Sequence, residues 1–238
     1  MRWLFLPFVL LLAGCVTTVE NPPPQPAPTQ QAAPASSFSY QPTRAQQQRF
    51  VSVVERMKPV AERECRQRAP QRNCNFKIVV DDRPNQPPNA FQTLDRNGRP
   101  ILAFNLALIA SVRNEDELAF VVGHEAAHHI AGHLQRQQQH ASAGAIIMGG
   151  LAAMTGASDV GIRTASDLGA AVGARSYSKE FELEADALGT VIAHRAGFNP
   201  VRGAEFFNQI PDPGDRFLGT HPPHAARIAT VRRVASQL

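Results

Sequence analysis

The segment Gly123–Leu134, GHEAAHHIAGHL, constrains the fold more than any other part of this 238-residue chain. It places four histidines and one glutamate in a stretch whose alanines and isoleucine are otherwise typical of a buried helix. On an α-helix, residues four apart lie on nearly the same face, about 6 Å apart along the axis. His124 and His128 meet this condition. The spacing therefore predicts that both imidazoles face one point in space.

Two imidazoles placed in this way can bind one Zn²⁺, because both can reach it with bonds of about 2.0–2.1 Å. Glu125 is rotated by about 100° from His124 on the helix. Its carboxylate would thus lie beside the metal, where it can take a proton from a bound water instead of acting as a ligand. This is the His-Glu-x-x-His arrangement of zinc peptidases.

The remaining histidines are not predicted to join this pair. On one continuous helix, His129 is turned by about 100° from His128, and His133 by about 180° from His124. We expect both to be structural or exposed to solvent. The same expectation holds for His140 and His194.

A catalytic zinc site needs three protein ligands and leaves the fourth position to water. The segment SKEFELEADALGTVIAHRAGFNP, which starts at Ser178, predicts a helix that places Glu182 and Asp186 on one face, while Glu184 points elsewhere. Glu182 could complete the metal shell. Asp186 could accept the N–H of a ligand histidine and fix its tautomer. The alternative is a pair of surface acids.

Three blocks, HEAAH, YSKEFELEAD and GTHPPHAARI, together make the chain similar to the gluzincin family of HtpX-like and prenyl-protease-like metalloendopeptidases, metallopeptidase family forty-eight, and particularly to its exported BepA-like branch. The resemblance spans roughly residues 89–227. It implies one zinc ion per chain, held by His124, His128 and Glu182. It also implies Glu125 as the general base and Asp186 as a partner of a ligand histidine.

The same resemblance implies roles for two later residues. His221 matches a position that can occupy the fourth metal site and hold a resting state; a capping or surface role is the alternative. Arg227 matches a recurring arginine that could stabilise an oxyanion, and a structural ion pair is the alternative. The family usually has arginine where this chain has Lys179, so a role that needs a guanidinium there is not carried over.

The first 42 residues do not resemble a folded domain. Residues 1–14 carry one arginine, a short apolar run and small residues before Cys15, which predicts a removable signal peptide. The ending Leu-Ala-Gly-Cys resembles a lipobox, in which Cys15 is lipidated; a chance match would leave a soluble periplasmic chain. Residues 15–42 are rich in proline and glutamine and predict a disordered tether. The metallopeptidase domain is expected over 43–238.

Export has two further consequences. Cys65 and Cys74 are expected to form a disulfide in an oxidising compartment, with two buried thiols as the alternative. The net charge of +4 includes a basic cluster over 49–72, but glutamates interrupt it, which favours a solvated helix face over an anion-binding site. An exported chain is not expected to bind nucleic acid.

The expected fold class is α+β: a mostly helical, zincin-like domain with a small β-sheet or hairpin edge beside the active-site helix. Capping boxes at Thr43 and Asn114 predict two helix starts, the first helix kinking or ending at Pro59 and the second continuing past Gln135. Residues 76–81 predict a strand, Asn97-Gly98 predicts a hairpin, and a last helix follows THPPH. The Ala- and Gly-rich segment 143–157 predicts a core helix, a mobile lid or a membrane-touching loop, in preference to a spanning helix.

The chain is therefore expected to be a zinc endopeptidase that hydrolyses misfolded or unassembled cell-envelope proteins, bound as extended strands beside the NAFQTL edge. Its lipid anchor is expected in the outer membrane, facing the periplasm, because Val16 follows the cysteine where a retention signal would have Asp. One alternative is a non-proteolytic, zinc-stabilised lipoprotein that assists outer-membrane assembly as a chaperone. Another is an anchored structural lipoprotein with accidental motifs.

Overall fold

The structure is a computed structural model that describes residues 41–176, 178–214 and 221–238. All of these residues belong to the unit Phe38–Leu238. The predicted signal peptide, Cys15 and residues 15–40 of the predicted tether lie outside the described residues.

Helix α1 (Arg44–Arg68) begins at the predicted capping box. The Thr43 hydroxyl accepts a hydrogen bond from the Gln46 N–H, and the Gln46 side chain accepts one from the Thr43 N–H. The helix does not end at Pro59, as the sequence allowed, but continues for two more turns. Pro59 lies on the exposed face, where water can satisfy the carbonyl that loses its partner, while Val60 and Ala61 remain buried in the core.

A disulfide joins Cys65, near the end of α1, to Cys74, just before the first strand. Their Cα atoms are 5.6 Å apart, and both side chains are buried. The predicted pairing is thus confirmed. It fixes the loop that carries Asn73, which contacts the histidine-rich helix described below.

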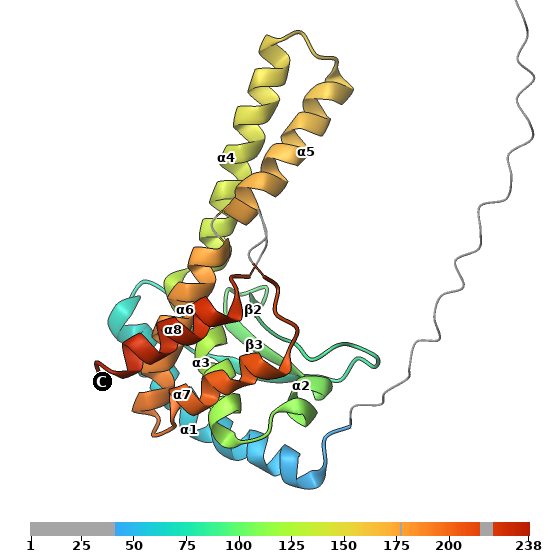
Figure 1. Ribbon diagram of the computed structural model, residues 1–238. Helices are drawn as coiled ribbons and strands as arrows, with labels where there is room; N and C mark the ends of the chain where they lie inside the picture. Colours follow the sequence, from blue (N-terminus) through green and yellow to red (C-terminus); the bar gives the residue numbers. More distant parts are fainter. Residues whose placement is uncertain (1–40, 177, 215–220) are drawn as a thin grey trace, which may run out of the picture. The chain divides into compact units, whose positions relative to one another are not determined.

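The sheet has three strands, β1 (Lys77–Asp81), β2 (Ala90–Leu94) and β3 (Pro100–Asn105), in the order β1-β3-β2. β1 is parallel to β3, and β2 is antiparallel to it. The predicted hairpin connects β2 and β3: Gly98 has a φ of 73°, and the Asp95 carboxylate accepts the N–H groups of Asn97 and Arg99. β2 therefore forms an edge of the sheet (Figure 1).

Helix α3 (Glu115–Ala131) begins where Asn114 predicts it, with the Asn114 side chain accepting from the Glu117 N–H. It follows a short helix α2 (Leu106–Ser111), capped by Asn105, that was not predicted. The prediction that α3 continues past Gln135 is wrong. Gly132 takes a left-handed conformation with a φ of 72°, which ends α3 and starts a new helix at His133.

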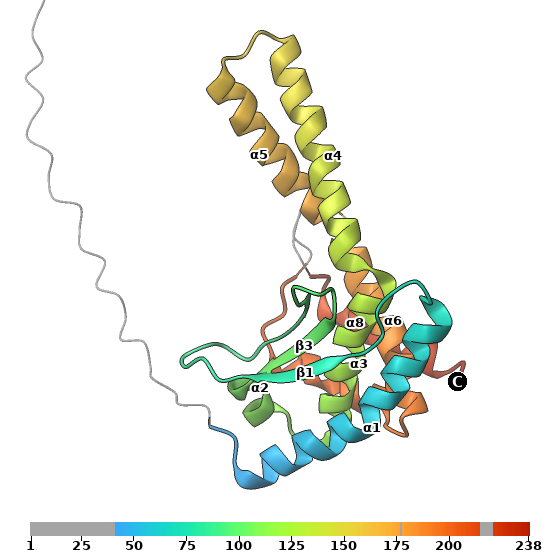
Figure 2. The same cartoon turned by 180° about the vertical axis from the view of Figure 1, so that it is seen from behind.

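Helices α4 (His133–Met154) and α5 (Asp159–Ser176) pack side by side as a hairpin, which Figures 1 and 2 show from opposite sides. The hairpin was not predicted. Most of segment 143–157 lies in α4, and Ile146 and Met154 are 74% and 87% exposed, so the core-helix interpretation is wrong. Among the described helices, none is long and apolar enough to cross a membrane.

Helix α6 (Ser178–Arg195) is followed by α7 (Pro200–Gly203), the 3₁₀ helix η1 (Ala204–Gln209) and α8 (His224–Ala235). As predicted, a glycine with positive φ, Gly197, follows α6, and the Asn199 side chain caps the next helix. The main core contains buried side chains from α1, β3, α2, α3 and α6. The mostly helical α+β class is thus confirmed, with α3 and α6 adjacent at its centre (Figure 1).

Candidate metal centre

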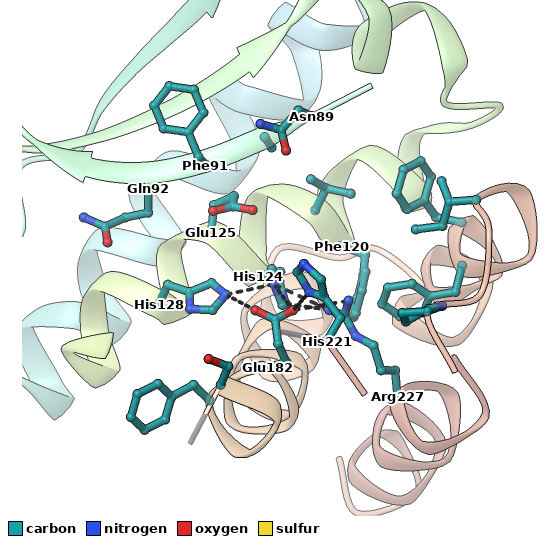
Figure 3. Close-up of a pocket in the computed structure, with 18 of the residues that line it drawn as sticks. Asn89, Phe91, Gln92, Phe120, His124, Glu125, His128, Glu182, His221 and Arg227 are labelled. Carbon is teal, nitrogen blue, oxygen red and sulfur yellow. Dashed lines mark hydrogen bonds and ion pairs between the residues drawn. The ribbon is translucent and has the colours of Figure 1, made fainter. Parts of the chain in front are cut away.

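Helices α3 and α6 bring three potential metal ligands together, two imidazoles and one carboxylate (Figure 3). His124 Nε2 and His128 Nε2 are 2.9 Å apart. The Glu182 oxygens lie 3.3 Å from His128 Nε2 and 3.6 Å from His124 Nε2. Ligand atoms at 2.0–2.1 Å from a tetrahedral zinc would be separated by about 3.3 Å. The three side chains therefore fit a zinc ion without rearrangement of the helices.

Two glycines allow the helices to come this close. A Cβ atom on Gly123 would lie 2.8 Å from the Gly189 carbonyl oxygen, and one on Gly189 would lie 2.8 Å from the His124 backbone nitrogen. Neither glycine was predicted to have a role. The sequence nevertheless contains a sign of the close approach: Gly189 follows Glu182 by seven residues, so a residue without a side chain lies on the same helix face as the ligand, two turns away.

Asp186 lies behind His124, where it was expected. Its Oδ1 is 2.9 Å from His124 Nδ1, so that Nδ1–H donates to the Asp186 carboxylate while Nε2 faces Glu182. Arg227 donates two hydrogen bonds of 2.7 Å to Asp186, and its guanidinium lies 4.1 Å from the Phe207 ring centre. Of the two interpretations of Arg227, the structure therefore contains the ion pair.

Two of the three candidate ligands, His124 and Glu182, have pKa values that differ from their ordinary ones. Burial alone would lower the pKa of His124, but hydrogen bonds with Asp186 and Glu182 outweigh it and raise this pKa to about 10. Burial alone would raise the pKa of Glu182, yet hydrogen bonds with His124, His128 and His221 lower it well below its ordinary value. Without a metal, the site thus keeps the Glu182 carboxylate charged and a second proton on His124 beside it, and a bound cation would take the place of that proton.

Glu125 is buried and points from α3 into the space between β2 and the metal-ligand group (Figure 3). Burial raises the pKa of Glu125, although the neighbouring His124 and His128 oppose the shift. A carboxylate with a raised pKa is a stronger base than an ordinary surface glutamate. Its placement beside the ligands is the one that the sequence spacing predicts.

These groups form one wall of an open cavity of about 500 Å³. The edge strand β2 forms the opposite wall through Phe91 and Gln92 (Figure 3), and Leu134 and Phe181 also line the cavity. A cavity of this volume can admit several residues of an extended peptide.

His221 lies at the same site, with its Nδ1 3.1 Å from a Glu182 oxygen and its side chain 54% exposed. Residues 215–220, which precede it, lie outside the described residues. His221 is thus in contact with a candidate metal ligand, as its predicted role requires.

Of the four histidines that were expected to lie away from the metal, His133 is the exception. His129 is buried and contacts the Asn73 carbonyl, and His194 is exposed, as expected. His140 is half-buried near the Phe181 ring. His133, however, lies with its Nδ1 2.8 Å from His128 Nδ1. The expected 180° separation is wrong because Gly132 ends the helix before this residue.

Comparisons with known proteins agree with this geometry. The sequence profile described as Peptidase family M48 matches residues 45–235. The beta-barrel assembly-enhancing protease of Escherichia coli strain K12 is 28% identical over 172 residues, which cover 63% of this chain and 33% of that protein. The protein of the same name from Yersinia pestis is 28% identical over 177 residues, which cover 69% and 35%. The chain thus spans about a third of the length of the curated relatives it matches.

Proposed function

Because this chain belongs to peptidase family M48, we propose that it is a zinc-dependent endopeptidase that cleaves unfolded segments of cell-envelope proteins. The observation that carries the proposal is the convergence of His124, His128 and Glu182 beside Glu125 in an open cavity. Two imidazoles and a carboxylate are a ligand set of catalytic zinc sites. A metal kept for structure alone would favour four protein ligands and would have no use for a buried base.

Each polar group of the site has a role in peptide hydrolysis. When bound, zinc supplies Lewis-acid chemistry that polarises a carbonyl oxygen and acidifies water. Glu125 accepts the proton of the attacking water and passes it to the leaving amine. Asp186 holds His124 in the tautomer that presents Nε2, and Arg227 holds Asp186 in place. The chain thereby positions a base and directs two imidazole nitrogens at the place a metal would occupy, and a bound metal would displace the second proton of His124.

The edge strand β2 offers a place for the substrate. Among the described strands it pairs with β3 alone, so its outer edge can accept an extended peptide by β-augmentation. Phe91, which is 37% exposed, lies on this strand and lines the cavity. Backbone pairing recognises an extended conformation more than a particular side chain. This supports broad cleavage of unfolded segments.

The proposed place of action is the periplasmic face of the outer membrane. It rests on the signal peptide predicted for residues 1–14, on the predicted lipidation of Cys15 and on the tether predicted to follow it. The matched relatives are named as proteases that enhance β-barrel assembly, which supports envelope proteins as substrates.

Removal of the metal tests the proposal directly. The purified protein should bind close to one zinc ion per chain and cleave a chemically unfolded protein. Dialysis against a chelator should abolish cleavage, and one equivalent of zinc should restore it. Zinc binding without cleavage of any unfolded substrate would favour the chaperone alternative, and failure to bind zinc would reject the proposal.

His221→Ala should raise the rate of cleavage. If His221 occupies the metal's fourth position in a resting state favoured about ten to one, its removal should increase activity about tenfold. Initial rates on an unfolded substrate at equal zinc loading measure this effect. His194→Ala, which changes an exposed histidine, is the matched control. An unchanged or lower rate for His221→Ala would count against the resting-state role.

A further inference from the structure

The second nitrogen of His128 begins a chain of contacts that the proposed reaction does not use. His128 Nε2 faces Glu182, while its Nδ1 lies 2.8 Å from His133 Nδ1. His133 Nε2 in turn lies 3.2 Å from a Glu184 oxygen. Arg136 donates a 2.7 Å hydrogen bond to the same Glu184 oxygen. Three side chains, those of His133, Glu184 and Arg136, thus connect a candidate metal ligand to the surface.

The acceptor at the far end determines the direction of these hydrogen bonds. A carboxylate can only accept, so His133 must carry its proton on Nε2 and donate it to Glu184. The Nδ1 of a neutral His133 is then an acceptor, and it takes the Nδ1–H of His128. His128 is left with its Nε2 lone pair directed at Glu182 and His124, which is the tautomer that binds a metal.

The fold holds His133 in this position from several sides. The left-handed Gly132 ends α3 and turns the first residue of α4 back toward His128. The His133 ring stacks on Phe181 of α6, with ring centres 4.6 Å apart and an interplanar angle of 9°. Its residue exposure is 4%. A ring packed in this way has little freedom to rotate away from His128.

We propose that His133 is a positioning residue that orients His128 for metal binding, and that Glu184 fixes the tautomer of His133. The two ligand histidines are then supported in parallel ways. His124 donates directly to the buried Asp186, whereas His128 reaches the more exposed Glu184 through one intervening imidazole. This inference rests on the proposed metal-dependent function, because it assigns a role toward the same ion.

The competing explanation is that His133 is a buried ring that packs at the start of α4. Three substitutions separate the two. His133→Phe retains an aromatic ring against Phe181 but removes the acceptor for His128. Glu184→Lys places a side chain that can only donate at the end of the chain, whereas Glu184→Gln retains an accepting oxygen. His129→Phe is the matched control, since it makes the same change at the adjacent buried histidine, which contacts the Asn73 carbonyl instead.

The experiment measures zinc affinity of the purified full-length protein by competition with a chromophoric chelator, together with thermal unfolding of each metal-free variant. His133→Phe should bind zinc about 10- to 100-fold more weakly than the parent. Glu184→Lys should also bind more weakly, and Glu184→Gln should stay within about threefold, as expected for a retained acceptor. His129→Phe should keep the parent affinity even if its unfolding temperature falls.

Substitution of cobalt for zinc adds a readout that packing alone would not change. His133→Phe should alter the visible absorption of the cobalt-loaded protein, and His129→Phe should not. Parent-like zinc affinity in both His133→Phe and Glu184→Lys would overturn the inference, as would equal weakening by His129→Phe. If the parent binds zinc and cleaves substrate while these results are found, the proposed function stands and the role of His133 alone is rejected. A parent that binds no zinc would overturn both.

Discussion

Glu125→Gln should reduce cleavage of an unfolded protein by about 100- to 10,000-fold, the range expected for loss of a general base. The amide has nearly the shape of the carboxylate but cannot accept a proton from water. Steady-state rates at saturating zinc measure the effect. Because the ligands His124, His128 and Glu182 are untouched, bound zinc should remain close to one per chain.

The same substitution should not weaken the fold. Burial raises the pKa of Glu125 above its unfolded value, so the ionised carboxylate costs stability at any pH above that unfolded value. At pH 7 a neutral amide removes this cost, and the metal-free variant should unfold at the parent temperature or slightly above it. Glu180→Gln makes the same chemical change at an exposed position on α6 and should leave cleavage unaffected. Substantial cleavage by Glu125→Gln would reject Glu125 as the base.

The features predicted correctly from sequence depend on short-range interactions. The capping box at Thr43, the N-cap at Asn114 and the turn at Asn97-Gly98 each involve residues within a few positions of one another. At Asn114 the reciprocal bond of a capping box does not form, because the Glu117 carboxylate accepts the Arg113 N–H instead. The same is true of the pairing of His124 with His128, because helix geometry alone determines it. Local geometry was therefore sufficient for most element starts and for half of the candidate site.

The errors arose where distant packing decides the local conformation. Gly132 could have continued α3, since glycine is tolerated inside helices at a cost of about 1 kcal/mol. Its left-handed conformation instead starts α4 along a new direction, and this placed His133 beside His128. Packing also explains why, of the two outcomes expected at Pro59, α1 does not end there: burial of the residues beyond it outweighs one lost hydrogen bond.

Long-range contacts also determine which partners the candidate residues have. The position of Asp186 on another helix gives Arg227 the ion pair that one of its two interpretations expected, while its oxyanion role stays a prediction. Helix periodicity correctly grouped Glu182 with Asp186, but it could not give the distance between α6 and α3. That distance depends on residues without side chains at the crossing point.

Gly189→Ala should impair both stability and metal binding for this reason. The added methyl group would meet the backbone nitrogen and Cα of His124 at 2.8 and 3.0 Å, and neither atom can move independently of α3. The helices must therefore separate by several tenths of an ångström. Overpacking of this kind costs about 1–3 kcal/mol of unfolding free energy. Because Glu182 lies on the helix that moves, its carboxylate shifts as well. A shift that approaches 1 Å would lower cleavage by up to about 100-fold, and a smaller shift by less.

Gly150→Ala is the matched control, because a Cβ at Gly150 of α4 would meet nothing within 4 Å. This substitution should stabilise the protein by up to about 1 kcal/mol through the better helix propensity of alanine. The same propensity gain applies to Gly189→Ala, so the difference between the two variants isolates the cost of separating α3 from α6. Denaturant unfolding and chelator competition measure both consequences. Equal stability and equal zinc affinity in the two variants would show that the close crossing at Gly189 does not position the ligands.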